Sequence, residues 1–281
     1  MKPFVLLLLF ALVACARAGE GRLTVSSFST ILTEIAREIG GDKVEVIGHV
    51  KPGMDPHQFE PGPAHLEIVS SSDLILVSGR HLENYVGKLR EAAGGRAALL
   101  EVGDQIPGPK DDPHWWHSIG NVERATRIVR DELILLRPDD RSEFEANAAA
   151  YTGRLEALKK WVKAKVAELP RDRRKLVTNH DSFGYFARDF GFTVRPIAGL
   201  TQNDQPGSKK VAEIIAEIHR EGVKAIFSEA YENPKVIQQV TRETGAKLGG
   251  KLYSDGLGAK PDASVDAMFR HNVTTIVEAL K

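Results

Sequence analysis

One stretch of the chain, from Arg141 to Leu169, has a helical pattern and no strand pattern, and it divides the sequence into two halves. Its apolar residues recur at intervals of seven, four, three, four and four: Phe144, Tyr151, Leu155, Leu158, Val162 and Val166. This spacing predicts one long helix, which Asp139 or Asp140 could cap and which Pro170 ends. At the standard rise such a helix is roughly 42 Å long, so we expect a strut between two lobes.

On either side of this stretch, short β-branched segments alternate with amphipathic segments, about four times in each half. The expected strands are 23–28, 44–50, 74–78 and 97–102, followed by 175–179, 193–198, 225–228 and 247–253. Alternation of this kind predicts parallel sheets covered by helices. We therefore expect an α/β fold of two (βα)4-type lobes, at 22–138 and 171–281, joined by one long backbone helix at 139–170.

The N-terminus has the pattern of a targeting segment. Lys2 precedes an apolar run from Pro3 to Ala14, which is too short to span a bilayer comfortably. Two processing signals overlap, because Leu12–Cys15 resembles a lipobox whereas Ala16–Ala18 has the form that signal peptidase cleaves. We expect residues 1–18 to be a signal peptide, with a lipid anchor at Cys15 as the alternative, and a mature protein in the periplasm or an equivalent extracytoplasmic space.

Composition restricts the partners and the kinds of site. The 281 residues include 38 basic and 38 acidic side chains, and a formal net charge of zero gives no broad attraction for nucleic acid or an anionic membrane. Cys15 is the only cysteine, so the mature chain has no disulfide and no thiolate ligand. Any metal must be held by nitrogen and oxygen ligands. We expect a monomer that does not bind nucleic acid.

Four short segments present candidate metal ligands, two in each half. They are Met54–Pro61 with His57, Asp112–Trp116 with His114, Thr178–Phe186 with His180, and Leu252–Gly258 with Asp255. Each falls just beyond a predicted strand or in the loop after it, and ligands of parallel α/β sheets bind outside the carboxyl ends of the strands. Imidazole and carboxylate groups suit a borderline divalent ion such as zinc. The sequence therefore predicts a metal site in a cleft between the lobes.

These segments resemble the ligand motifs of the TroA-like metal-binding solute-binding proteins of ABC importers, over essentially the whole mature chain. The resemblance implies two pseudo-symmetric lobes of limited mobility, one backbone helix, and one metal ion bound by His57, His114, His180 and Asp255. It also implies an ABC permease in the cytoplasmic membrane as the partner. This chain departs from the family in two places. The usual proline after the second motif is missing, since His117-Ser118-Ile119-Gly120 follows Trp116, and Gly103–Asp111 lacks the long histidine-rich loop of many zinc-type relatives.

Several residues near the motifs have open roles. His117 could replace His114 as the ligand if a helical turn begins there. Trp115 and Trp116 are expected to cover the site or to pack between the lobes. Candidate acceptors for the imidazole N–H groups are Glu60, Asp112, Asp181 and Glu229. Core or surface roles are expected for the remaining histidines, His49, His65, His81, His219 and His271.

His180 decides the expected metal. Manganese-type relatives commonly have glutamate at this position, whereas zinc-type relatives have histidine, so the resemblance implies one Zn²⁺ per chain, with Mn²⁺ as the alternative. Three imidazoles and one carboxylate also suit tetrahedral zinc. We therefore expect the zinc-binding component of an ABC transporter, without enzymatic activity. The alternatives are a secreted zinc hydrolase, although the chain has no H-E-x-x-H motif, and a surface adhesin.

Overall fold

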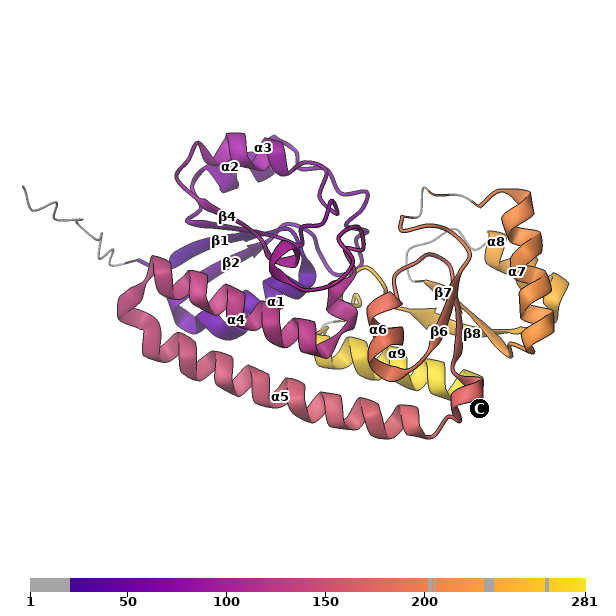
Figure 1. Ribbon diagram of the computed structural model, residues 1–281. Helices are drawn as coiled ribbons and strands as arrows, with labels where there is room; N and C mark the ends of the chain where they lie inside the picture. The colour runs from indigo at the N-terminus through magenta and orange to yellow at the C-terminus, as the bar shows by residue number, and fades with distance from the viewer. Residues whose placement is uncertain (1–20, 202–203, 205, 230–234, 261–262) are drawn as a thin grey trace, which may run out of the picture.

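The fold consists of two parallel sheets joined by helices (Figure 1). The structure is a computed structural model that describes residues 21–201, 204, 206–229, 235–260 and 263–281. The predicted signal peptide and the anchor at Cys15 lie outside the described residues. Among the described residues, no helix is long and apolar enough to span a membrane.

The two sheets have the same topology. The first has the order β2-β1-β3-β4 and the second the order β6-β5-β7-β8, with all pairs parallel. The strands are β1 (Leu23–Ser27), β2 (Val44–Gly48), β3 (Leu74–Val77), β4 (Ala98–Glu101), β5 (Lys175–Thr178), β6 (Thr193–Pro196), β7 (Ala225–Glu229) and β8 (Lys247–Leu252). The eight predicted strands are all present. We call the sheets with their helices the N-terminal and the C-terminal lobe.

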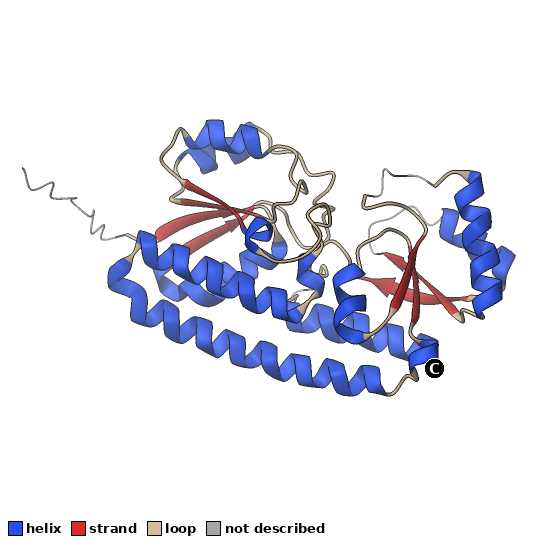
Figure 2. Ribbon diagram, in the orientation of Figure 1, coloured by secondary structure: helices blue, strands red, loops and turns tan. Residues whose placement is uncertain are grey.

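Helices follow the strands and cover the sheets (Figure 2). The N-terminal lobe contains α1 (Thr30–Gly40), α2 (Pro63–Ser70), α3 (Val86–Ala93) and α4 (Ile119–Leu136), and the C-terminal lobe contains α6 (Gly184–Phe190), α7 (Ser208–Glu221), α8 (Lys235–Thr244) and α9 (Val265–Leu280). Short 3-10 helices occupy Gly41–Lys43, Val102–Gln105, Trp115–His117, Pro138–Asp140 and Arg171–Arg173. The side chains of Ser29, Ser118 and Ser264 accept hydrogen bonds from backbone N–H groups in the first turns of α1, α4 and α9, respectively. These capping bonds fix where the three helices begin.

The predicted strut is α5 (Arg141–Ala167), which extends along both lobes (Figure 1). All six apolar residues that predicted it are buried. Asp140 occupies the cap position, but the expected side-chain capping bond is absent. Its carboxylate instead pairs with Arg137 at 3.0 Å and with Lys43 at 3.5 Å. The prediction of a capping bond was therefore wrong, because neighbouring cations bind the carboxylate.

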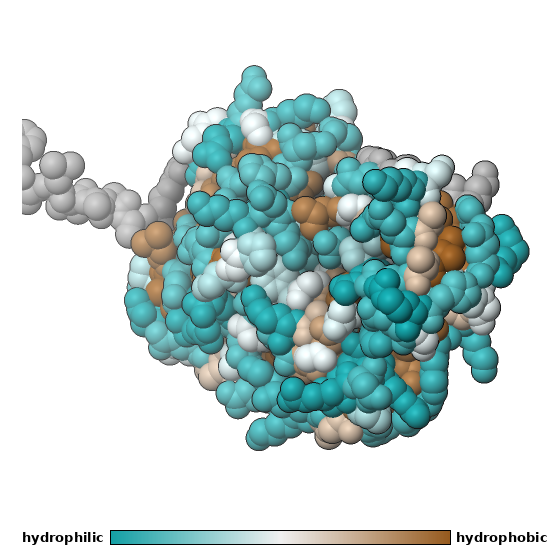
Figure 3. Space-filling model, turned by 45° about the vertical axis from the view of Figure 1, so that its right-hand side comes forward, coloured by the Kyte–Doolittle hydropathy of each residue, from teal (hydrophilic) through white to brown (hydrophobic). Residues whose placement is uncertain are grey.

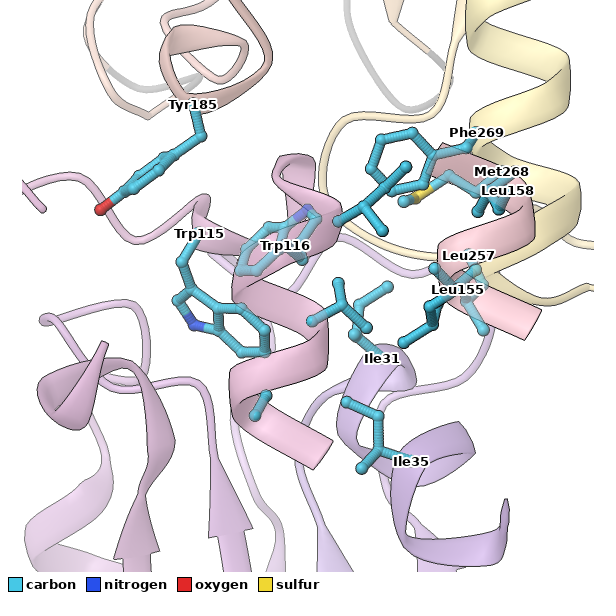
Figure 4. Close-up of a cluster of buried hydrophobic side chains, with 14 of the residues drawn as sticks. Ile31, Ile35, Trp115, Trp116, Leu155, Leu158, Tyr185, Leu257, Met268 and Phe269 are labelled. Carbon is cyan, nitrogen blue, oxygen red and sulfur yellow. The ribbon is translucent and has the colours of Figure 1, made fainter. Parts of the chain in front are cut away.

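The largest buried cluster crosses from one lobe to the other (Figure 4). Side chains from α1, α5, the loop after β8 and α9 meet there, among them Ile31, Leu155, Leu257 and Phe269. A smaller cluster lies within each lobe. Since close-packed apolar surfaces resist separation, the shared core joins the lobes in addition to the strut.

The surface is mostly hydrophilic in the view of Figure 3, with hydrophobic residues in small separate areas. Among the described residues, the large apolar side chains that are exposed are Met54, Leu135 and Leu248. They belong to three different parts of the fold.

Candidate metal centre

The four predicted ligand side chains meet between the lobes, with their ligand atoms all within 4.8 Å of one another. Asp255 Oδ1 lies 3.3 Å from His57 Nε2, 3.4 Å from His114 Nε2 and 3.2 Å from His180 Nε2. His114 Nε2 lies 3.3 Å from each of the other two Nε2 atoms. Ligand atoms around a tetrahedral zinc, with bonds of ~2.0–2.1 Å, are roughly 3.3–3.4 Å apart. These five distances fit a four-coordinate ion, and the ligand atoms of the remaining pair, His57 and His180, lie within 4.8 Å of each other.

The N-terminal lobe positions two of the imidazoles through aspartates two residues earlier. The His57 backbone N–H donates to Asp55 Oδ1 at 2.9 Å, in the loop between β2 and α2. The His114 backbone N–H donates to Asp112 Oδ1 at 3.0 Å, and the Nδ1 atom of His114 lies 2.9 Å from the same oxygen. When Nδ1–H donates a hydrogen bond to Asp112, the lone pair of Nε2 is available to bind a metal ion.

The C-terminal lobe positions His180 just after β5. The Thr178 hydroxyl donates to the His180 carbonyl oxygen at 2.9 Å, and the His180 N–H donates to Glu229 Oε1 at 3.2 Å. The other oxygen of Glu229 pairs with His180 Nδ1. Glu229 ends β7, the neighbour of β5 in the sheet, so parallel pairing brings it beside His180.

Asp255 completes the cluster from the loop after β8. The Ser254 hydroxyl donates to Asp255 Oδ2 at 2.9 Å, which directs Oδ1 toward the imidazoles. The side chains of His114, His180 and Asp255 are fully buried, and that of His57 is 6% exposed. A metal ion would therefore be largely shielded from solvent, with the side of His57 the more open.

Two of the four candidate imidazole acceptors are in place and two are not. Asp112 and Glu229 contact His114 and His180 as predicted. The prediction for Glu60 is wrong, because its carboxylate pairs with Lys88 at 3.1 Å on the surface. Asp181 has no side-chain hydrogen bond to an imidazole among the described residues.

His117 lies outside the cluster, contrary to the alternative that it replaces His114. Its Nε2–H donates to the Ser254 carbonyl at 2.7 Å, and its ring stacks on Phe183 with centroids 4.4 Å apart. Burial lowers the pKa of His117 to about 3, so the ring is neutral. Trp116 Nε1 donates to the same carbonyl at 2.8 Å, and its ring covers His114 as expected. Trp115 instead donates to Ser78 within the N-terminal lobe.

The other five histidines also lie away from the cluster, in core or surface positions as expected. Buried His49 lies 2.9 Å from the Ser26 hydroxyl, and burial lowers its pKa to about 4. His65 accepts from the Gly62 N–H, and His219 and His271 donate to backbone carbonyls. His81 is exposed and has a left-handed backbone conformation.

Charge within the cluster favours protonated imidazoles beside an ionised carboxylate. Burial alone would lower the pKa of His114 and His180, but the carboxylates around them raise the pKa of each above its ordinary value. Burial alone would raise the pKa of Asp255, but His180 and the other imidazoles hold that pKa well below its usual range. A cation at the centre would take the place of the protons on the imidazoles.

Comparisons with known proteins agree with a metal-binding role. The family model ZnuA, described as zinc-uptake complex component A, periplasmic, matches residues 25–279. The manganese-binding lipoprotein MntA of Bacillus subtilis is 32% identical over 298 residues, covering 99% of this chain and 97% of that protein. The zinc-binding protein TroA of Treponema pallidum is 30% identical over 278 residues, covering 94% of this chain and 90% of that protein.

The fold also matches a solved structure over nearly its whole length. The periplasmic zinc-binding protein TroA of Treponema pallidum superposes with a TM-score of 0.85 at 29% identity, covering 92% of this chain and 99% of that one. The two-lobe α/β architecture is therefore shared over nearly the whole of both chains.

Proposed function

Because the chain belongs to the ZnuA family of metal-binding solute-binding proteins of ABC transporters, we propose that it captures zinc outside the cytoplasmic membrane and delivers it to a permease. His57, His114, His180 and Asp255 are the proposed ligands of one Zn²⁺ ion. The ion is cargo, so it must be bound tightly and later released.

The observation that carries this proposal is the position of Asp255 Oδ1, which lies 3.2–3.4 Å from all three Nε2 atoms. Three neutral nitrogen donors and one carboxylate oxygen at tetrahedral spacing suit zinc, which accepts four ligands without geometric strain. Asp112 and Glu229 support this role, because an acceptor on Nδ1 fixes the ring and raises the basicity of Nε2.

Manganese is the second candidate. The Bacillus subtilis relative, 32% identical, is named for manganese binding, whereas the Treponema pallidum relative is named for zinc. The donor set favours zinc over manganese, because manganese prefers oxygen donors and zinc lies above it in affinity for a given nitrogen and oxygen site.

We do not propose an enzymatic role. A catalytic zinc keeps three protein ligands and leaves the fourth position to a water molecule. Here Asp255 occupies that fourth position and is itself held by Ser254. A closed ligand set of this kind suits the capture of an ion better than catalysis.

Metal content and complementation together test the proposal. The protein purified from its own compartment, without added metal, should contain one zinc ion per chain and little manganese when both are measured by mass spectrometry. A strain that lacks the gene should grow poorly in chelated medium, recover with added zinc, and be complemented by the wild-type gene but not by Asp255→Ala. If the purified protein contains manganese, or if only manganese restores growth, then manganese and not zinc is the cargo.

A further inference from the structure

The loop that carries Asp255 follows a strand of the C-terminal lobe, yet it is hydrogen-bonded to the N-terminal lobe. The Ser254 carbonyl accepts from Trp116 Nε1 at 2.8 Å and from His117 Nε2 at 2.7 Å. A carbonyl oxygen has two lone pairs, so these two donors use its full capacity. Ser254, Trp116 and His117 are all buried, and bonds made away from water are the costly ones to leave unmade.

Two further bonds tie the continuation of this loop to α1 of the same lobe. The Leu257 N–H donates to Thr30 Oγ1 at 3.0 Å, and the Val265 N–H donates to Glu34 Oε2 at 2.7 Å. Gly256 allows this close approach, because it has a φ of 153° and a Cβ atom there would lie 2.6 Å from Thr30 Oγ1. The segment Ser254–Gly258, which we call the Asp255 loop, and Val265 at the start of α9 therefore contact the N-terminal lobe.

The anchored carbonyl belongs to the residue that orients the ligand. The Ser254 hydroxyl donates to Asp255 Oδ2, and Asp255 Oδ1 then faces the imidazoles. Any shift of the Ser254 backbone would move both the carboxylate and the hydroxyl that holds it.

The hydrogen bonds described for His180 come from the C-terminal lobe, whereas Phe183, three residues later, stacks on His117 of the N-terminal lobe. The backbone and the Nδ1 atom of His180 are bound by Thr178 at the end of β5 and by Glu229 at the end of β7. The next residue, Asp181, donates its N–H to the Gly199 carbonyl of the same lobe at 2.8 Å.

We propose that Trp116 and His117 are positioning residues that hold the Asp255 loop on the N-terminal lobe. Asp255 then stays with His57 and His114 when the lobes separate. His180 moves with the C-terminal lobe, and its departure opens the site. This inference rests on the proposed function, because it assumes that the four residues bind the cargo ion.

Substitutions at His117 test the positioning role. His117→Phe keeps an aromatic ring against Phe183 but removes the donor to Ser254, whereas His117→Gln keeps an N–H donor. Tyr185→Phe is the matched control, because it removes another bond between the lobes, from Arg80 to the Tyr185 hydroxyl, without touching the Asp255 loop. The readouts are zinc affinity by chelator competition and the visible spectrum of the Co²⁺-loaded protein, which reports coordination geometry.

His117→Phe should weaken zinc binding by ~10–100-fold, in the range found for outer partners of ligands, and should change the cobalt spectrum. His117→Gln should restore most of the affinity, and Tyr185→Phe should remain close to wild type. Wild-type affinity and spectrum in both His117→Phe and the double variant Trp116→Phe/His117→Phe would overturn the proposal. So would an equal loss in Tyr185→Phe. A wild-type protein that binds neither zinc nor cobalt would instead refute the proposed function.

Hydrogen exchange tests the same proposal in the wild-type protein, without a variant that must fold. The Leu257 amide, which binds Thr30 of the N-terminal lobe, should stay protected in both the zinc-loaded and the metal-free protein. Loss of that protection on zinc removal would show that the loop moves with the C-terminal lobe, and would overturn the proposal.

Discussion

Asp255 Oδ1 lies 3.3 Å from His57 Nε2, although the two residues belong to different lobes and to opposite ends of the chain. Only the folded chain brings these atoms together, so metal binding and folding are linked.

The first prediction separates His114 from His117. His114→Ala should weaken zinc binding far more than His117→Ala, because it removes an atom that bonds the ion. The His117 change removes the bond to the Ser254 carbonyl and the stack on Phe183 but no bond to the ion, and it should cost ~10–100-fold. Calorimetric titration of both variants measures the difference. A reversed order would make His117 the ligand.

The second prediction concerns pH. The raised pKa values of His114 and His180 mean that the metal-free site holds protons above the ordinary histidine pKa of about 6.5. Zinc must displace these protons, so zinc affinity should rise with pH and still be rising above pH 6.5. The rise should be about tenfold per pH unit for each proton that zinc displaces. Asp255, with its lowered pKa, is already ionised and adds no proton. Titration in buffers from pH 5 to 8 tests this, and a flat profile would rule out imidazole ligands.

The third prediction concerns Glu34, which bridges α1, α5 and α9. Burial raises its pKa to about 7, despite hydrogen bonds from the Val265 N–H and the Tyr151 hydroxyl and the nearby charge of Arg154, and Glu38 adds to the increase. The folded form then keeps a proton that the unfolded form loses. Stability from this group is present below pH ~4.5 and is lost as pH rises through 7.

Glu34→Gln should remove this loss and flatten the pH dependence of unfolding. Relative to wild type, the gain at pH 8 should be on the order of 3 kcal/mol, for a shift of about two and a half pKa units. Urea unfolding of the metal-free proteins at pH 5 and pH 8 measures the effect. If the free energy of unfolding changes by the same amount between pH 5 and pH 8 in wild type and variant, Glu34 does not titrate in this range.

The fourth prediction concerns selectivity. His180→Glu replaces a borderline nitrogen by a harder oxygen and should narrow the preference for zinc over manganese. It need not invert the preference, because zinc binds a given site of this type more tightly than manganese does. Competition titration of the two metals against wild type and variant gives the ratio, with circular dichroism as the control for folding. If the ratio of zinc to manganese affinity is the same in wild type and variant, His180 is not a ligand.

Most of the fold could be predicted from the sequence, because its signals are local. The eight strands and α5 follow from apolar spacing over short windows, and all were found with ends shifted by a few residues. The meeting of the four ligand segments was also predictable, because parallel sheets place the carboxyl ends of their strands at one edge. Pattern alone could not show that α1, α5 and α9 share a core across the lobes.

Residues that support the site were harder to predict, because their partners are distant in the chain. Glu229 could have been assigned to His180 from strand order, since β7 lies beside β5. Glu60 was a wrong choice because nearness in sequence to His57 does not direct a side chain toward it. Nothing in the sequence indicated that Trp116 and His117 both bind the Ser254 carbonyl, because that contact depends on how the two lobes pack.

The central claim is that one metal ion is bound by four residues drawn from both lobes. Anomalous diffraction at the zinc edge, from crystals of the zinc-loaded protein, tests it most directly. We predict a single strong peak bonded to the Nε2 atoms of His57, His114 and His180 and to Asp255 Oδ1, at ~2.0–2.2 Å. A peak elsewhere in the chain, or one that lacks either His180 or Asp255 as a ligand, would contradict the account.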